Sequence, residues 1–353
     1  MNYLLLKAKR LFPAYFAMVM TTGALSIGFH FQGFTSAAKV LLGVNVFIYG
    51  WLWVMTFVRL FKFYSRLASD VKSHDKGPGF FTLVAGTCVF GSQVYTITNN
   101  VVISSILWGI GIFLWILVMY TFFTSITIRK NKPSLGKGIN GAWLIAAVGT
   151  QSVSILGTLI SPAITNADMK EMVLFFTLCM YFLGCMLYLN IITLIFYRFS
   201  FLKLDFKALT PPYWINMGAV AITTLAGATL ILHQNEFGLI LEITPFLKGF
   251  TTFFWVTGTW WIPLLFILMI WKHVVHRFPL TYDPQYWGMA FPLAMYTTST
   301  WQLAEALELS FLTIIPQIMV IIAAIVYIAV FLGFLHHIYR DMQFFIRHKK
   351  AAR

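Results

Sequence analysis

Long apolar stretches alternate with short polar loops along the whole chain. Each stretch holds about 20 or more mostly apolar residues, which is the length that an α-helix needs to cross a bilayer. The pattern predicts ten membrane spans, over residues 12–33, 37–63, 79–98, 101–127, 139–161, 172–199, 212–232, 244–271, 285–308 and 311–339.

Every second span begins with the same local pattern. A mostly aromatic pair leads into a run rich in Gly, Ala, Thr and Ser, and successive pairs are 65, 62, 71 and 73 residues apart. A repeat of this kind indicates copies of one structural unit, here a helical hairpin. The pairs are Tyr15-Phe16, Phe80-Phe81, Ala142-Trp143, Tyr213-Trp214 and Tyr286-Trp287. We therefore predict an all-α integral membrane domain over 1–353, without a soluble domain, made of hairpins 12–63, 79–127, 139–199, 212–271 and 285–339 around an axis.

Composition and charge agree with a membrane location. The chain is 59% hydrophobic and only 10% charged, yet its net charge is +14. One side of the predicted spans holds only Lys39, Lys170 and Lys248, so the other 22 of the 25 Lys and Arg lie on the opposite side. Because cationic loops stay in the cytoplasm, we expect a multi-pass protein of the cell membrane with both termini cytoplasmic. The basic charge then reflects topology, and we expect no nucleic-acid partner.

The odd-numbered spans carry small and hydroxyl residues, whereas the even-numbered spans are bulkier and more apolar. Buried hydroxyls and amides need partners that lipid cannot supply, so we expect the odd spans inside and the even spans against lipid. Small residues also mediate helix packing without any pore, but their recurrence in five helices favours a central conduit. The predicted pore-lining residues are Thr21, Thr22, Gly23, Gly86, Thr87, Phe90, Gln93, Gly149, Thr150, Gln151, Ser152, Asn216, Gly218, Val220, Thr223, Thr298 and Gln302.

The ninth span has the clearest helical stripe. Phe291, Met295, Thr298, Gln302 and Glu305 fall at i, i+4, i+7, i+11 and i+14, which places them on one helix face. Glu305 ends this stripe, and we expect it in the outer vestibule rather than at mid-membrane.

No Asp, Glu, Lys or Arg lies in the middle of a predicted span. Ion-coupled carriers usually keep a carboxylate there, so a neutral hydroxyl-lined path with a basic cytoplasmic face suits passive movement of an anion. One alternative is a proton-coupled dicarboxylate symporter that uses Glu305. A membrane enzyme is the other, but it would need converging catalytic or metal-binding residues, and we find none in the sequence. We expect no enzyme activity, metal site or cofactor.

Four segments resemble the tellurite-resistance/dicarboxylate transporter family, which includes fungal malate permeases and plant slow anion channels. They are PAYFAMVMTTGALSIGFH (13–30), FFTLVAGTCVFGSQ (80–93), WINMGAVAITTLAGA (214–228) and YWGMAFPLAMYTTST (286–300). The resemblance covers nearly the whole chain. It implies ten helices in five hairpins, a quasi-five-fold pore lined by the odd helices, and a homotrimer. It also implies transport of small anions, either C4-dicarboxylates such as malate and succinate or chloride and nitrate, and it raises a role in tellurite resistance.

The family also places a phenylalanine across the pore as a gate. The matching residue is Phe291, directly before Pro292. A proline inside a helix removes one backbone donor and bends the helix, which can turn the preceding ring toward the axis. An aromatic ring in a narrow apolar neck blocks ions by its size and by excluding water.

Overall fold

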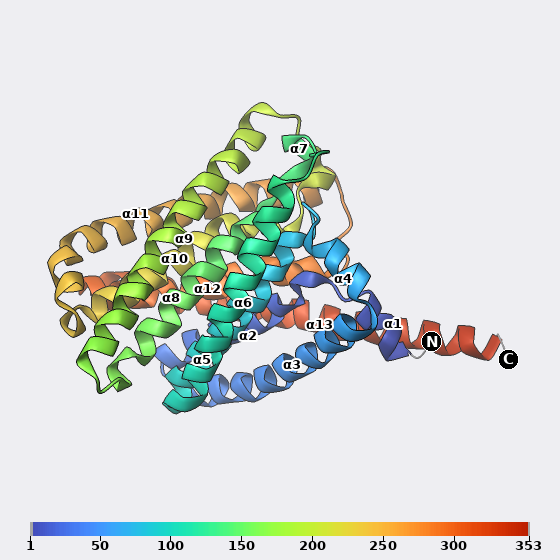
Figure 1. Cartoon of the computed structure of the whole chain (residues 1–353). Helices are drawn as coiled ribbons and strands as arrows, with labels where there is room; N and C mark the ends of the chain where they lie inside the picture. Colours follow the sequence, from blue (N-terminus) through green and yellow to red (C-terminus); the bar gives the residue numbers. More distant parts are fainter. Residues whose placement is uncertain (1–2, 352–353) are drawn as a thin grey trace.

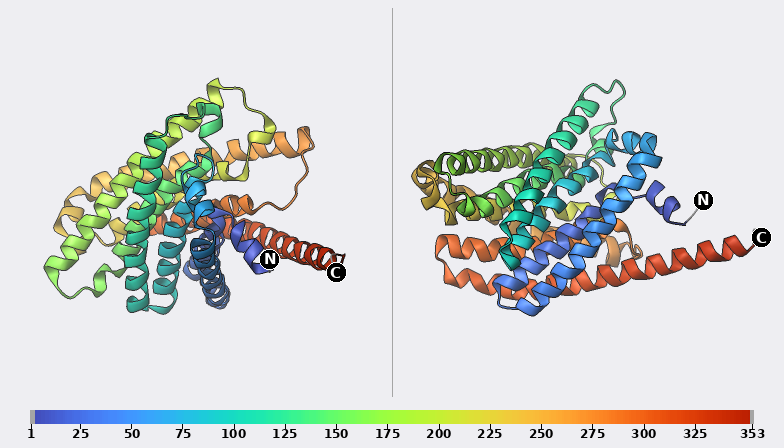
Figure 2. Two further views of the ribbon diagram at one scale, coloured as in Figure 1. Left: turned by 45° about the vertical axis from the view of Figure 1, so that its right-hand side comes forward. Right: turned by 60° about the horizontal axis from the view of Figure 1, so that its bottom comes forward.

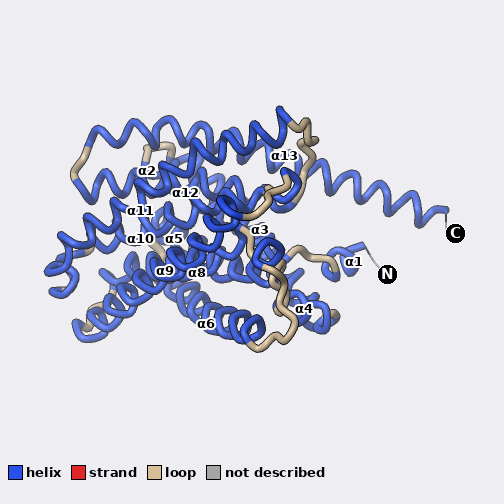
Figure 3. Tube along the Cα trace, turned by 90° about the horizontal axis from the view of Figure 1, so that it is seen from above, coloured by secondary structure: helices blue, strands red, loops and turns tan. Residues whose placement is uncertain are grey.

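The computed structural model describes residues 3–351, and it is helical throughout, with no β-strand in that range. Figure 1 shows long helices packed side by side, and Figure 3 shows that only short loops join them. The long helices are α2 (Ala17–Phe31), α3 (Thr35–Lys62), α5 (Phe81–Thr98), α6 (Val101–Thr127), α8 (Ile145–Ile160), α9 (Ala167–Phe201), α10 (Ile215–Leu232), α11 (Gly238–Ile270), α12 (Trp287–Leu307) and α13 (Ile314–Ala351). The short helices are α1 (Tyr3–Lys9), α4 (Tyr64–Val71) and α7 (Leu135–Gly138).

Nine helices within residues 3–351 are long and apolar enough to cross a membrane. The predicted span 285–308 forms α12, which is not among these nine. Its hydroxyl run from Thr297 to Thr300, followed by Gln302 and Glu305, makes it less apolar than its neighbours. Every residue from Trp287 to Thr300 is nevertheless buried inside the protein.

Five of the long helices form a closed inner ring. α2 contacts α5, α5 contacts α8, α8 contacts α10, α10 contacts α12, and α12 returns to α2. The helices α3, α6, α9, α11 and α13 surround this ring, and each packs against the inner helix that precedes it in the sequence. The inner helix α10 lies within Pro211–Leu232, and 94% of the residues in the most apolar 18-residue part of this segment are buried. In the corresponding part of the outer helix α3, only 22% of the residues are buried. The inner helices are thus covered by protein, while the outer helices keep broad exposed apolar faces.

All five inner helices begin at the same end of the molecule. Each is preceded by a 3₁₀ turn, and these turns also contact one another in a closed ring. They are η1 (Pro13–Phe16), η2 (Gly77–Phe80), η3 (Gly141–Leu144), η6 (Pro211–Trp214) and η9 (Pro284–Tyr286). Four of them carry proline at the first positions, where a fixed φ and a missing N–H suit a helix start. In η3 the side chain of Asn140 instead accepts a hydrogen bond from the N–H of Ala142 at 2.9 Å.

The two ends of the chain lie on one side of the molecule (Figure 2). The α1 helix contacts α3, and the Lys7 ammonium group forms an ion pair with Asp341 near the end of α13. This contact joins the first and last helices of the chain outside the ring.

α10 and α12 approach one another closely where Gly218 faces Pro292. A Cβ atom at Gly218 would lie 2.6 Å from Cγ and 3.2 Å from Cα of Pro292. The absence of a side chain at Gly218 therefore lets the proline-containing part of α12 lie against α10.

We predict that Gly218→Ala lowers stability by about 1–3 kcal/mol, because the added methyl group would overpack a rigid contact. The measurement is the apparent unfolding temperature of the purified protein in detergent. Gly288→Ala is the matched control, since a Cβ atom there meets nothing closer than 3.6 Å, the distance to Cδ1 of Ile215. Equal unfolding temperatures for Gly218→Ala and the parent would contradict this account.

Candidate functional site

A cavity of about 270 Å³ lies where the inner helices begin, and all five inner helices contribute to its wall. One residue of each inner helix lines it in the first turn: Ala17, Thr82, Ile145, Ile215 and Gly288. Three residues further on, Met20, Val148 and Phe291 line it from α2, α8 and α12. The remaining lining residues are Phe12, Ala14, Asp75, Lys76, Gly79, Asn140, Ala142, Pro212, Pro284 and Gln285.

The cavity runs from a polar mouth to an apolar floor. Asp75 and Lys76 at the mouth are exposed, whereas Asn140 and Gln285, which also line the cavity, are half-buried. The side chain of Phe291 on the floor is only 1% exposed. A small polar solute could therefore enter the mouth, but it would meet a buried phenyl ring at the other end.

The backbone makes the cavity favourable for anions. The aligned peptide dipoles of an α-helix place partial positive charge at its N-terminus. The first N–H of each inner helix is bonded to a carbonyl of the 3₁₀ turn before it, so the dipoles, not unpaired N–H groups, supply this charge. Five inner helices direct that end toward this cavity. The stabilisation of an anion at one such terminus is about 0.3–1 kcal/mol and falls off within the first turn, so the effect is confined to the cavity.

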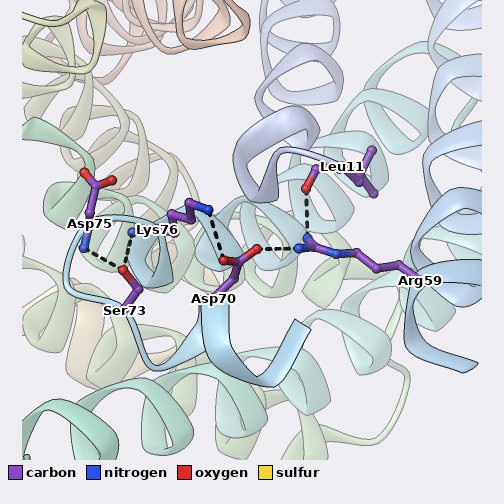
Figure 4. A network of polar contacts seen from close by, with 6 residues as sticks. All are labelled: Leu11, Arg59, Asp70, Ser73, Asp75 and Lys76. Carbon is purple, nitrogen blue, oxygen red and sulfur yellow. Dashed lines mark hydrogen bonds and ion pairs between the residues drawn. The ribbon is translucent and has the colours of Figure 1, made fainter. Parts of the chain in front are cut away.

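Charged side chains at the mouth are held by a network from neighbouring elements (Figure 4). The Lys76 ammonium group lies 3.2 Å from one carboxylate oxygen of Asp70 in α4, and Arg59 of α3 bonds the other. Arg59 also donates to the backbone carbonyl of Leu11 at 2.8 Å. Burial lowers the pKa of His74 in the same loop, and the positive charges of Arg129 and Lys132 lower it further.

Of the predicted site residues in the part of the chain that the structure describes, Phe291 is the one that lines this cavity. Pro292, the other predicted gate residue, contacts the position of Gly218 as described above. The other predicted residues lie in the inner ring with contacts of their own, so their role as pore lining stays a prediction.

Several of the predicted hydroxyl residues bond to aromatic side chains of the outer helices. The Tyr327 hydroxyl lies 3.2 Å from Thr22 Oγ1, the Tyr49 hydroxyl lies 3.1 Å from Thr87 Oγ1, and Trp115 Nε1 donates to Thr150 Oγ1 at 2.8 Å. The same connection recurs from Tyr188 to the carbonyl oxygen of Asn216 (3.3 Å) and from Trp255 to Thr300 Oγ1 (3.0 Å).

These five contacts, which we call the aromatic braces, follow one rule. Each joins an outer helix to the inner helix of the next hairpin, in the order α3–α5, α6–α8, α9–α10, α11–α12 and α13–α2. The bond from Tyr327 on α13 to Thr22 on α2 closes the circle between the two ends of the chain. The aromatic braces therefore tie neighbouring hairpins together in the same sense all the way round.

The remaining predicted polar residues make varied contacts. The Thr21 hydroxyl lies 2.7 Å from the carbonyl oxygen of Ala17 and 3.3 Å from that of Trp287, and Thr298 donates to that of Ala24 at 2.9 Å. Four other predicted residues also form side-chain hydrogen bonds. They are Gln93 with the Asn45 side chain (2.7 Å), Gln151 with the Tyr181 carbonyl (3.0 Å), Ser152 with the Gly149 carbonyl (2.7 Å) and Thr223 with the Ala219 carbonyl (2.7 Å). Asn216 is fully buried, and its side-chain amide has no hydrogen-bond partner among the described residues.

The predicted glycine and apolar positions lie at close helix contacts. A Cβ atom at Gly23 would lie 2.9 Å from Val89, one at Gly86 would lie 3.2 Å from Phe16, and one at Gly149 would lie 3.5 Å from the carbonyl of Phe81. Phe90 contacts the ring of Tyr49, and Val220 lies next to Gly258 of α11. Gln302 is half-buried, and Glu305 is exposed near the end of α12 away from the cavity.

The cavity residues that sequence analysis missed lie at the helix starts. Ala17, Thr82, Ile215 and Gly288 each follow directly after one of the repeated pairs, and Ile145 follows one residue later. Aligning the five pairs would have found this ring of positions. Lys76 and Asp75 precede their pair by four and five residues, and no sequence pattern singled them out.

The environment of Phe291 differs from that of a packing phenylalanine. Phe254 of α11 is equally buried and makes ring contacts with Tyr188, Phe250 and Phe253 at centroid distances of 5.0–5.9 Å. Phe291 makes no ring contact with another aromatic side chain in the described residues and instead borders the cavity.

The buried ring, the apolar outer faces and the nine apolar helices define a multi-pass membrane protein. The chain belongs to the voltage-dependent anion channel family, which matches residues 10–335. This match confirms the resemblance to the tellurite-resistance/dicarboxylate transporter family inferred from the four segments. The family is one of channels and transporters.

Relatives from archaea and bacteria agree with this assignment. Two uncharacterized transporters of Methanocaldococcus jannaschii are similar over most of their length. One is 28% identical over 302 residues, which cover 83% of this chain and 83% of the transporter. The other is 27% identical over 299 residues, which cover 81% of this chain and 83% of the transporter. An uncharacterized membrane protein of Mycobacterium tuberculosis is 37% identical over 152 residues, 43% of this chain and 77% of that protein.

We predict that the brace between Tyr327 and Thr22 contributes to stability rather than to conduction. Removing either hydroxyl (Tyr327→Phe or Thr22→Val) should destabilise the protein, and a double-mutant cycle should give a coupling free energy of about 0.6 kcal/mol, the average for such bonds between membrane helices. The measurement is reversible unfolding in mixed micelles, with Tyr120→Phe on the exposed face of α6 as control. Zero coupling, together with a change in anion flux for Thr22→Val alone, would show that Thr22 acts in the pore instead.

Proposed function

We propose that this protein is an anion channel or transporter of the cell membrane, with ten spans in five hairpins and a quasi-five-fold pore on the axis of the inner ring. The observation that carries the proposal is the cavity to which all five inner helices contribute and which ends at Phe291. Membership in the voltage-dependent anion channel family supports an anion as the solute.

Small anions suit the dimensions and chemistry of the cavity. Its volume of about 270 Å³ lies below the range of about 300–1,000 Å³ typical of sites for drug-sized ligands. Five helix N-termini favour negative charge there, while the opposite charges of Lys76 and Asp75 on the lining offset each other. We propose C4-dicarboxylates such as malate and succinate, or chloride and nitrate, as the transported anions. A role in tellurite resistance rests on the family resemblance alone.

The orientation follows from the loops. The helix starts, the cavity mouth and both ends of the chain share one side, and the sequence places most Lys and Arg in the loops of that side. We therefore propose that the cavity opens to the cytoplasm. The exposed apolar faces of the outer helices would meet lipid and, in a homotrimer, neighbouring protomers; the trimer rests on the family resemblance, and native mass measurement in nanodiscs would decide it.

We predict that a reporter fused after the last residue, which lies outside the described residues, is active only in its cytoplasmic form. The reason is the charge bias of the loops on the side where both ends lie. A fusion within the Ile160–Ala167 connection, on the opposite side, is the control and should give the reverse pattern. Activity of the C-terminal fusion in its external form would contradict the proposed orientation.

We propose that Phe291 is the gate of the pore. Its ring is buried on the floor of the cavity, it lacks aromatic ring contacts within the described residues, and it precedes the proline that lies against Gly218. A bulky apolar side chain at that point would exclude both ions and water from the neck.

We predict that Phe291→Ala increases anion flux and folds nearly as well as the parent. Truncation of a fully buried phenylalanine usually costs about 3–5 kcal/mol, but water can fill the space next to a cavity, so the penalty here should be smaller. The measurement is current and uptake after reconstitution into liposomes, with chloride, nitrate, malate and succinate. Phe291→Leu should give an intermediate flux.

Phe254→Ala is the matched control, because Phe254 is equally buried but packs against three aromatic rings. It should lose stability and gain no flux. A well-folded Phe291→Ala protein that conducts no more than the parent would exclude the gate, and an absence of anion movement in all variants would exclude the proposed function.

A further inference from the structure

Two charged side chains line the cavity, and they have opposite signs. Asp75 and Lys76 are neighbours in the loop before α5, and the other lining residues of the described chain are neutral. Both are exposed at the mouth. Burial and nearby cations lower the pKa of His74, which disfavours a positive charge on its ring. The side chains that line the cavity in the described residues therefore carry no net charge, and Lys76 is the one cation among them.

Lys76 is held in place by residues outside the cavity. Its ammonium group lies 3.2 Å from Asp70 Oδ1, while the other oxygen of Asp70 is bonded by Arg59 (Figure 4). The Arg59 side chain is only 4% exposed, and its second nitrogen donates to the Leu11 carbonyl, so this residue forms a fixed anchor between α3, α4 and the start of the chain.

The loop itself is also fixed on the Asp75 side. Ser73 Oγ accepts hydrogen bonds from the backbone N–H groups of Asp75 (3.3 Å) and Lys76 (3.4 Å). One carboxylate oxygen of Asp75 accepts from Asn140 Nδ2 at 3.4 Å. The two charges thus occupy defined places on the same rim of the cavity.

We propose that Lys76, positioned by Asp70 and Arg59, and Asp75 form a charge pair that sets how strongly the mouth attracts anions and how it discriminates divalent from monovalent ones. This inference rests on the proposed function. Lys76 offsets the repulsion that Asp75 would otherwise exert on an approaching anion. The Lys76 side chain is half exposed, so its influence passes through water and depends on salt.

Electrostatics gives this pair a recognisable signature. The concentration of an ion at the mouth varies exponentially with the product of its charge and the local potential. A change of potential that lowers chloride flux n-fold should then lower the flux of a divalent dicarboxylate about n²-fold. Two unit charges about 6 Å apart in water interact by about 0.7 kcal/mol, which is a factor of about 3, so n should be roughly 3 and n² roughly 10.

The first test measures the potential at the mouth without relying on conduction. Gln285 lines the cavity, and a Gln285→Cys protein with exposed Cys179 changed to serine offers one accessible thiol there. This thiol is reacted with two methanethiosulfonate reagents, one with an anionic sulfonate group and one with a cationic trimethylammonium group. The ratio of the anionic to the cationic reaction rate reports the local electrostatic potential. Lys76→Gln should lower the anionic-to-cationic rate ratio about tenfold, Asp75→Asn should raise it, and Lys76→Arg should leave it near the parent value.

The second test measures fluxes of chloride and succinate below saturation in the same variants. At an ionic strength of about 0.01 M, where the Debye length is about 30 Å, Lys76→Gln should lower chloride flux about threefold and succinate flux about tenfold. The difference should vanish near 1 M impermeant salt, where screening acts over about 3 Å. Lys137→Gln is the matched control, because Lys137 is an exposed lysine that does not line the cavity.

The outcomes separate this inference from the proposed function. An unchanged reagent ratio in Lys76→Gln, or equal factors for chloride and succinate, would overturn the charge pair while leaving an anion channel intact. A shifted reagent ratio in a protein that moves no anion would support the charge pair as the determinant of the mouth potential and refute the proposed function. Misfolding is recognised separately, because it would lower both fluxes equally and would not be relieved by salt.

Discussion

The structure depends on one constraint: the polar groups of the inner helices are shielded from both water and lipid and must find partners within the protein. The hydroxyls of Thr22, Thr87 and Thr150 each donate to the carbonyl four residues earlier in their own helix, at 2.7–2.8 Å. Their oxygen atoms can then accept a further bond from an aromatic side chain of an outer helix. This double use of one hydroxyl both satisfies a buried group and joins neighbouring hairpins.

The fourth hairpin shows that the bond matters more than the residue type. At the position corresponding to these threonines, α10 has Val220, which has no hydroxyl. The carbonyl four residues earlier, that of Asn216, is free to accept, and the Tyr188 hydroxyl bonds it directly. The same outer-to-inner connection is therefore kept with a different partner. Because Tyr327 makes the last such bond to Thr22, the first and last hairpins are joined without a covalent link.

The sequence predicted the separation of polar inner from apolar outer helices, because that separation follows from what lipid accepts. It could not assign each hydroxyl a direction. Thr22 and Thr150 lie on inner helices as expected, but a helix within a ring has faces toward the axis, two neighbours and the outer layer, and composition does not distinguish them. The cavity wall was instead encoded in the residue after each repeated pair, such as Ala17 and Gly288. Lys76 is placed by Asp70, six residues earlier, and by Arg59 of α3, and no repeated pattern in the sequence marks these contacts.

The position of Phe291 relative to the aromatic braces bears on how a pore in this ring could open. Met20 and Val148 lie on the cavity wall, two residues before Thr22 and Thr150 in their helices. The cavity floor, which these two residues form with Phe291, is therefore nearer to the helix starts than the braces made by Thr22 and Thr150. Widening the ring by separating hairpins would strain five bonds worth about 0.6 kcal/mol each, as well as the tight contact of Gly218 with Pro292. Rotation of one phenyl side chain would break none of them. The balance of these contacts favours a local side-chain gate over dilation of the whole ring.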